Sequence, residues 1–151
     1  MRKQHPPLLL ALILAAACAL AFVHPSCADA DDGAGTLQIT ITDIPSNNGI
    51  IKLEMYDSKA AYLQRFVRSA NMIIRDHTAS MPFPSLAYGT YAVFVFHDAN
   101  NNGQVDRNFL GIRTEKRMFS NNVDGMFGPP EWEEAAFEYK AGMTTLTISL
   151  K

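Results

Sequence analysis

Cysteine is scarce in this chain of 151 residues, which has only Cys18 and Cys27. Both lie in the N-terminal stretch that we expect to be removed on export. The remaining domain then has no thiol for a disulfide bond or a cysteine-ligated metal. Histidine is also scarce, with four in the chain, and no closely spaced pair indicates a zinc site. The domain must therefore rely on its own apolar core, or on a bound metal, for stability.

An excess of positive charge is missing as well. The chain has 13 Lys and Arg residues against 15 Asp and Glu residues, a formal net charge of −2. Proteins that bind nucleic acids or anionic membranes through their overall charge carry a basic excess. The composition indicates neither, and we expect the partner to be a protein, a glycan or a small ligand rather than a nucleic acid.

The N-terminus has the features of a secretory signal peptide. A short basic segment precedes an apolar run over residues 8–23, and small residues follow at Ala28 and Ala30. The run is about 16 residues long, shorter than the roughly 20 needed to cross a bilayer. We therefore expect cleavage of residues 1–30, a flexible linker over 31–35 and a single domain over 36–151. That domain would be exported to the periplasm or the extracellular space, with no transmembrane segment.

Alternating apolar and polar side chains predict β-strands at the start of the domain. Residues 36–42 alternate strictly, and residues 51–56 repeat the pattern. Between the two runs lies Asn48-Gly49, a pair typical of tight hairpins. The two strands are therefore expected to pair antiparallel.

Later segments also predict strands. Residues 91–97 are almost continuously apolar and β-prone, which is typical of a central strand covered on both faces. The other expected strands are 72–74, 78–83 (ended by Pro82 and Pro84) and 144–150.

Short helices are expected over residues 57–64 and 130–137. Short strands at this spacing, with turn residues between them, are typical of two packed antiparallel sheets. The predicted fold class is therefore all-β: an antiparallel β-sandwich of about seven strands with one or two short helices.

Oxygen-bearing side chains fall on every second residue after the strand that ends at His97. They are Asp98, Asn100, Asn102, Gln104 and Asp106, with Gly103 after the third. This spacing matches the first nine positions of an EF-hand calcium loop, in which Gln104 would supply its carbonyl oxygen. The twelfth position requires a bidentate glutamate but is Phe109, and no helix pair is expected around the loop. It is therefore not an EF-hand, and Glu115 is the nearest carboxylate that could complete a ligand shell.

Two interpretations of residues 98–106 remain open. In the first, the loop binds Ca²⁺ with a dissociation constant of roughly 10⁻⁴ to 10⁻³ M, because it contains only two carboxylates. In the second, the loop is structural. Its side chains then bond to their own backbone, and Asn102-Gly103 forms a tight turn.

The sequence favours a non-enzymatic binding or structural module. His97 is expected to be a strand-end imidazole that bonds to a loop carbonyl, because Asp98 beside it points to the opposite face. No Gly-x-Ser-x-Gly turn is present to expose Ser120 as a nucleophile. The alternative is a carbohydrate-active hydrolase that uses Asp106 and Glu115 as its pair of acids.

A mixed-charge cluster follows the oxygen-rich loop, over residues 113–117. It is interpreted either as solvated surface or as a contact for an anion or a glycan beside the loop. Trp132 is the only tryptophan of the chain. It is expected to pack on the sandwich rather than to stack on a sugar.

Five segments occur in a fixed order: GTY at 89–91, HDANNNGQVD at 97–106, LGIRTE at 110–115, FSNN at 119–122 and GPPEWEEAAF at 128–137. Together they resemble the bacterial domain-of-unknown-function family numbered 2141, which consists of small exported proteins without an assigned activity. The resemblance implies a secreted β-sandwich similar to transthyretin-like and carboxypeptidase-regulatory-like modules. The family pattern has proline at the position of Arg113 and an aromatic-glycine pair at Arg117-Met118. This chain is therefore more basic in that region.

Overall fold

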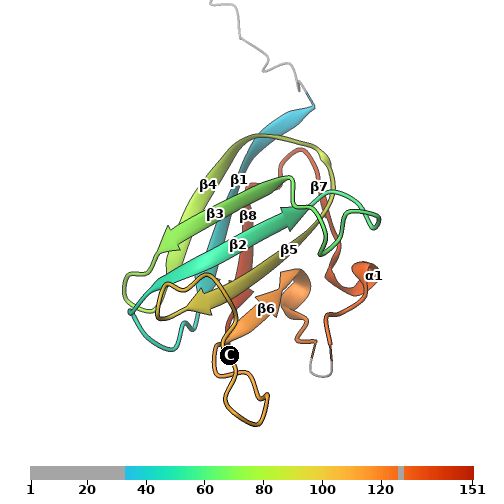
Figure 1. Cartoon of the computed structure of the whole chain (residues 1–151). Helices are drawn as coiled ribbons and strands as arrows, with labels where there is room; N and C mark the ends of the chain where they lie inside the picture. Colours follow the sequence, from blue (N-terminus) through green and yellow to red (C-terminus); the bar gives the residue numbers. More distant parts are fainter. Residues whose placement is uncertain (1–32, 126–127) are drawn as a thin grey trace, which may run out of the picture. The chain divides into compact units, whose positions relative to one another are not determined.

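Two β-sheets pack face to face in the computed structural model, which describes residues 33–125 and 128–151 (Figure 1). The predicted signal peptide and the first two linker residues lie outside the described residues. The described part contains eight strands: β1 (Ala34–Thr42), β2 (Ile50–Tyr56), β3 (Arg68–Ile73), β4 (Ala79–Ala87), β5 (Gly89–Asp98), β6 (Arg117–Phe119), β7 (Phe137–Tyr139) and β8 (Thr145–Ser149). Two short helical segments, η1 (Ser120–Asn122) and α1 (Trp132–Ala135), complete it. The predicted all-β sandwich class is confirmed.

The smaller sheet has the strand order β4-β1-β8, and the larger has the order β3-β2-β5-β6, with β7 also pairing with β5. All pairs are antiparallel except β1 with β8, which run parallel. The side chains that fill the space between the sheets come from alternate positions of the strands. The fully or nearly fully buried ones include Leu37, Ile39, Ile41, Ile51, Leu53, Met55, Met72, Val93, Val95 and Ile148.

The predicted hairpin between β1 and β2 is wrong, because the two strands lie in different sheets. Alternation determines which face of a strand is buried but not which strand lies beside it. The Asn48-Gly49 segment instead brings the chain against the end of β5. Gly49 has a φ of +72°, and a Cβ there would lie 2.0 Å from the carbonyl oxygen of Asp98. Glycine is therefore required at this close approach.

The two prolines do not end β4, which continues to Ala87. β4 is an edge strand, where a missing N–H can face away from the sheet. Pro82 lies opposite Gln38 in β1, and the N–H of Gln38 donates to Thr144 on its other side. No hydrogen bond of the ladder is therefore lost at Pro82.

The helix expected over 57–64 is wrong, since these residues form bends and turns. The second expected helix is confirmed as the shorter α1.

β5 is the central strand of the larger sheet, as predicted, and it is covered on both faces. Val93 and Val95 face the main core, whereas Ala92 packs with Phe119 and Ala135 in a smaller cluster on the opposite face. The outer edge of β5 pairs with β7 near its start and with β6 near its end. The loop of residues 99–116 leaves the sheet where β5 ends and returns as β6, at the lower end in Figure 1.

No helix among residues 33–125 and 128–151 is long and apolar enough to cross a membrane.

Candidate functional site

The oxygen-rich loop begins at Asp98, whose side chain is fully buried at the end of β5. Its carboxylate accepts backbone N–H groups from Asn102 at 2.9 Å and from Gly103 at 2.8 Å. The Asn100 side-chain oxygen also accepts the N–H of Asn102, at 3.1 Å, and the Asn102 side-chain oxygen accepts the N–H of Gln104, at 2.8 Å. The loop is thus wound around its own side chains, and Asp98 is the buried centre.

Asp106 closes this network from the other end of the loop. Its two carboxylate oxygens accept the side-chain amides of Asn100, at 2.7 Å, and Asn102, at 2.8 Å. The structure therefore joins Asp98, Asn100, Asn102 and Asp106 in one hydrogen-bonded network. Gln104 contributes its backbone N–H to the network.

Glu115 joins the two ends of the loop, although it lies nine residues beyond Asp106. Its carboxylate accepts the N–H of Ala99 at 2.9 Å and the N–H of Asp106 at 3.0 Å. Among the described residues, no group of three or more His, Cys, Asp or Glu side chains is placed to hold a metal ion. Glu115 lies beside the loop, and there it accepts hydrogen bonds from two backbone amides.

His97 is almost fully buried, with 4% of its surface exposed. Its Nε2 lies 2.7 Å from the carbonyl oxygen of Asn48. This confirms the predicted role of His97 as a strand-end imidazole bonded to a loop carbonyl.

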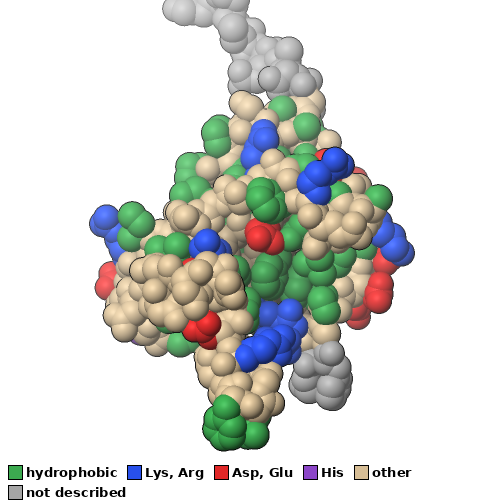
Figure 2. All heavy atoms as spheres, viewed as in Figure 1, with side chains coloured by type: hydrophobic (Ala, Val, Ile, Leu, Met, Phe, Trp, Pro, Cys, Tyr) green, Lys and Arg blue, Asp and Glu red, His purple; other side chains and the backbone are tan. Residues whose placement is uncertain are grey.

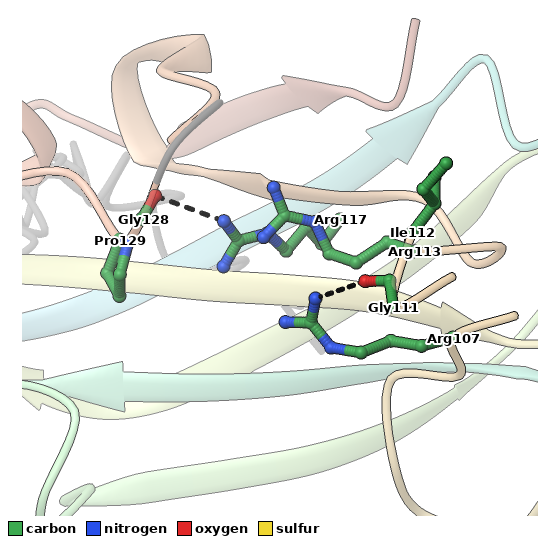
Figure 3. A pocket seen from close by; sticks show the side chains of 7 residues that line it. All are labelled: Arg107, Gly111, Ile112, Arg113, Arg117, Gly128 and Pro129. Carbon is green, nitrogen blue, oxygen red and sulfur yellow. Dashed lines mark hydrogen bonds between the residues drawn. The ribbon is translucent and has the colours of Figure 1, made fainter. Parts of the chain in front are cut away.

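A second feature of the same loop is a pocket of about 620 Å³ that contains three arginines (Figure 3). It is lined by Arg107, Gly111, Ile112, Arg113, Arg117, Gly128 and Pro129. In Figure 3 the three arginine side chains extend side by side toward Gly128 and Pro129. No Asp or Glu is among the described residues that line it.

The arginines are brought together by a small hairpin. The N–H of Thr114 donates to the carbonyl of Asp106 at 2.9 Å, and the N–H of Asn108 donates to the carbonyl of Ile112 at 2.8 Å. Arg107 and Arg113 form an isolated antiparallel bridge between these two bonds, so their side chains are cross-strand neighbours. Arg117 comes from β6, where it lies opposite Phe96 of β5.

Backbone carbonyls hold all three guanidinium groups. Arg107 donates to Gly111 at 2.9 Å, and Arg113 donates to Gly125 at 3.2 Å. Arg117 donates to Gly125 at 2.7 Å and to Gly128 at 3.1 Å. These bonds orient the three guanidinium groups in the pocket.

Arg117 is the most constrained of the three. Its Nε is buried and has no hydrogen-bond partner among the described residues. Its Cζ lies 5.5 Å from the ring centre of Phe119, within the range of a cation–π contact. Burial, and after it the charge of Arg113, lowers the pKa of Arg117, whereas the carboxylate of Asp124 acts in the opposite direction. Arginine stays charged in proteins, so Arg117 keeps its positive charge in the pocket.

An aromatic cluster lies next to Arg117. The Tyr62 ring packs edge-on against Phe119, Tyr56 and Trp132, with ring centres 5.6–6.3 Å apart. Burial raises the pKa of Tyr62 to about 12. Its hydroxyl has no partner among the described residues. Trp132 is thus part of the packing over the larger sheet, as expected.

The arginine pocket is only partly predictable from the sequence. Two of its three arginines belong to the cluster over 113–117, for which the sequence indicates either solvated surface or an anion contact. Arg107 was missed, because it precedes the cluster and joins it only through the hairpin. The carbonyls of Gly125 and Gly128 were also missed, because nothing in the sequence links them to Arg117.

Comparison with known proteins places the chain in a family. A family model described as "Uncharacterized protein conserved in bacteria (DUF2141)" matches residues 39–147. The chain belongs to this family. The match runs from β1 into β8 and confirms the resemblance seen in the five ordered segments. No curated protein and no solved structure matches the chain. The family description assigns no activity to the DUF2141 domain, so its function has to be argued from the site.

The two hydrogen bonds that Glu115 accepts should be measurable as stability. Replacing Glu115→Gln leaves one oxygen to accept two amides, so we expect the free energy of unfolding to fall by about 1–2 kcal/mol. Urea denaturation of the two proteins measures this difference. Glu138→Gln is the matched control, because the Glu138 side chain is 70% exposed and its ion pair with Lys140 is 3.4 Å long. It should change stability by less than about 0.5 kcal/mol. Equal losses in both variants would contradict the role given to Glu115.

Proposed function

We propose that this DUF2141 protein is an exported, non-enzymatic binding module whose arginine pocket receives the anionic part of its ligand. One observation carries the proposal: Arg107, Arg113 and Arg117 line a single pocket to which the described residues contribute no carboxylate. The ligand chemistry that this arrangement fits is a phosphate or carboxylate group. Export is supported by the leader-like N-terminus of the sequence.

The chemistry of guanidinium groups supports an anion as the ligand. A guanidinium presents N–H donors in a planar fork that matches two oxygens of a phosphate or carboxylate. The carbonyls of Gly111, Gly125 and Gly128 fix the three forks before any ligand arrives. Because the groups are already ordered, binding costs little side-chain entropy.

The hydrogen bonds that Asp106 and Glu115 accept favour a binding module over an enzyme. Asp106 accepts two side-chain amides, and Glu115 accepts two backbone amides. A pair of acids that cleaves a glycoside needs one carboxyl to hold a proton and the other to act as a base or nucleophile. Four hydrogen bonds from N–H groups instead favour both groups as charged acceptors that stabilise the loop.

Pyrophosphate binding tests the proposal. In calcium-free buffer, inorganic pyrophosphate at about ten times its dissociation constant should stabilise the protein by roughly 1.4 kcal/mol, a shift of several degrees in Tm. Sodium chloride of equal ionic strength should not reproduce the shift. Arg107→Gln/Arg113→Gln should weaken pyrophosphate binding in calorimetry at least about tenfold, because two charge-assisted contacts are lost.

The control for this experiment is Arg65→Gln/Arg68→Gln. It removes the same charge from two exposed arginines that do not line the pocket. If the control variant lost as much affinity as the pocket variant, the binding would reflect net charge alone, and the proposed site would be rejected.

Weak Ca²⁺ binding by residues 98–106 is a second candidate function. The observation that favours it is the convergence of Asp98, Asn100, Asn102 and Asp106 in one network. We infer that Ca²⁺ would replace the two asparagine amides that now donate to Asp106, so that both asparagines would turn their oxygens inward. Binding would then stabilise the loop on which the arginines are held.

Melting curves in chelator and in about 10 mM CaCl₂ test the calcium site. With a dissociation constant of roughly 0.1–1 mM, calcium should add about 1.4–2.7 kcal/mol to the free energy of unfolding, or several degrees in Tm. Asp106→Asn should abolish the shift, because it removes a carboxylate ligand. An unchanged Tm for the unsubstituted protein would leave residues 98–106 as a structural loop only.

A further inference from the structure

Three large apolar side chains project from the tip of the arginine hairpin into solvent. Phe109 is 95% exposed, Leu110 is 67% exposed and Ile112 is 59% exposed. Exposed apolar residues scattered over a surface are ordinary, but a cluster of them at one protruding point indicates a contact with something apolar. In Figure 2 this cluster is the apolar tip at the lower end of the molecule.

Hydrogen bonds within the hairpin hold the side chains of the tip outward. The side-chain oxygen of Asn108 accepts the N–H groups of Leu110 and Ile112, both at 3.0 Å. The N–H of Gly111 donates to the carbonyl of Asn108 at 2.9 Å. Gly111 itself has a φ of +77°, which glycine adopts without strain. These bonds hold the apolar side chains outward on an ordered turn.

The positive charges lie directly behind the tip. Arg107 and Arg113 flank it on the two arms of the hairpin, and Arg117 lies beyond them in β6. Ile112 lines the arginine pocket and also belongs to the tip, so the two surfaces are continuous. Figure 2 shows Lys and Arg side chains gathered between the apolar tip and the centre of this face.

This order, apolar side chains outermost and cations behind them, matches the cross-section of a lipid bilayer. Acyl chains lie below the headgroups, and the phosphates of anionic lipids attract Lys and Arg near the surface. We propose that residues 107–113 dock this protein on an anionic lipid bilayer. Phe109, Leu110 and Ile112 enter the acyl region, and Arg107, Arg113 and Arg117 bind lipid phosphates. The proposal rests on the anion-binding function proposed above and names lipid headgroups as the source of the anion.

The size and charge of the surface favour a bilayer over a protein partner. A stable protein interface typically takes about 20–30 residues from each side, whereas the apolar tip has three. Asp106 and Glu115 are held inside the loop by hydrogen bonds, and neither lines the arginine pocket. The carboxylate of Asp124 acts on Arg117 from outside the pocket lining. A surface with few apolar anchors and several cations is expected to bind a bilayer weakly and reversibly, and the binding should weaken as the salt concentration rises.

Sedimentation with lipid vesicles tests the proposal. We expect the protein to bind vesicles of phosphatidylcholine with about 30% phosphatidylglycerol, and to bind pure phosphatidylcholine vesicles at least fivefold more weakly. Phe109→Ser/Leu110→Ser should reduce binding to the anionic vesicles at least fivefold. Because the Phe109 and Leu110 side chains are largely in solvent, this variant should keep the Tm of the parent protein and its affinity for pyrophosphate.

The matched control is Phe66→Ser/Ile73→Ser, which removes two other exposed apolar side chains, 49% and 71% exposed. It should bind anionic vesicles as the parent does. All proteins compared carry the same N-terminus, so any difference between them reports on the substituted residues. Spectroscopy gives an independent measurement: the fluorescence of Phe109→Trp should shift to the blue on anionic vesicles, and that of Phe66→Trp should not.

The outcomes separate the two proposals. Unchanged vesicle binding by Phe109→Ser/Leu110→Ser, or equal binding to neutral and anionic vesicles, overturns the docking role of residues 107–113. Failure of the parent protein to bind any vesicle, while pyrophosphate still stabilises it, overturns the lipid source but retains the anion pocket. Loss of both activities in the parent protein rejects the two proposals together.

Discussion

The loop between β5 and β6 depends on two carboxylates that close it from the inside. Asp98, buried at the end of β5, accepts the N–H groups of Asn102 and Gly103, and Glu115 accepts those of Ala99 and Asp106. Backbone groups that would otherwise need water are thereby satisfied within the loop. Charge-assisted bonds of this kind are among the stronger hydrogen bonds of a protein. A long connection without strands of its own thus becomes an ordered support for the hairpin of residues 107–113.

The acidic, basic and apolar side chains of this region point in three different directions. Its acids point inward and accept hydrogen bonds, its arginines line a pocket on one side, and its apolar residues project from the tip. Positive charge gathers on the pocket side, where the described lining residues include no carboxylate.

The sequence predicted the features that depend on local spacing. Strict alternation identified the buried faces of β1 and β2, the apolar run identified β5 as a central strand, and the spacing of oxygen-bearing side chains identified a tight loop directly after β5. Which strands pair could not be predicted in the same way. Alternation of apolar and polar residues shows that β1 and β2 each bury one face, but it does not show that the two strands lie in different sheets. The prolines of β4 were misjudged because an edge position tolerates them.

The arginine pocket was only partly predictable because it is assembled across the fold. Arg107 and Arg113 meet through a hairpin, Arg117 comes from β6, and the carbonyls that orient them belong to Gly125 and Gly128. A net charge of −2 conceals this local excess of positive charge. The most direct test is an NMR titration of the arginine Nε–H signals with inorganic pyrophosphate. The account predicts saturable shifts for Arg107, Arg113 and Arg117 with no shift for Arg65. Equal shifts for all arginines, or none, would contradict it.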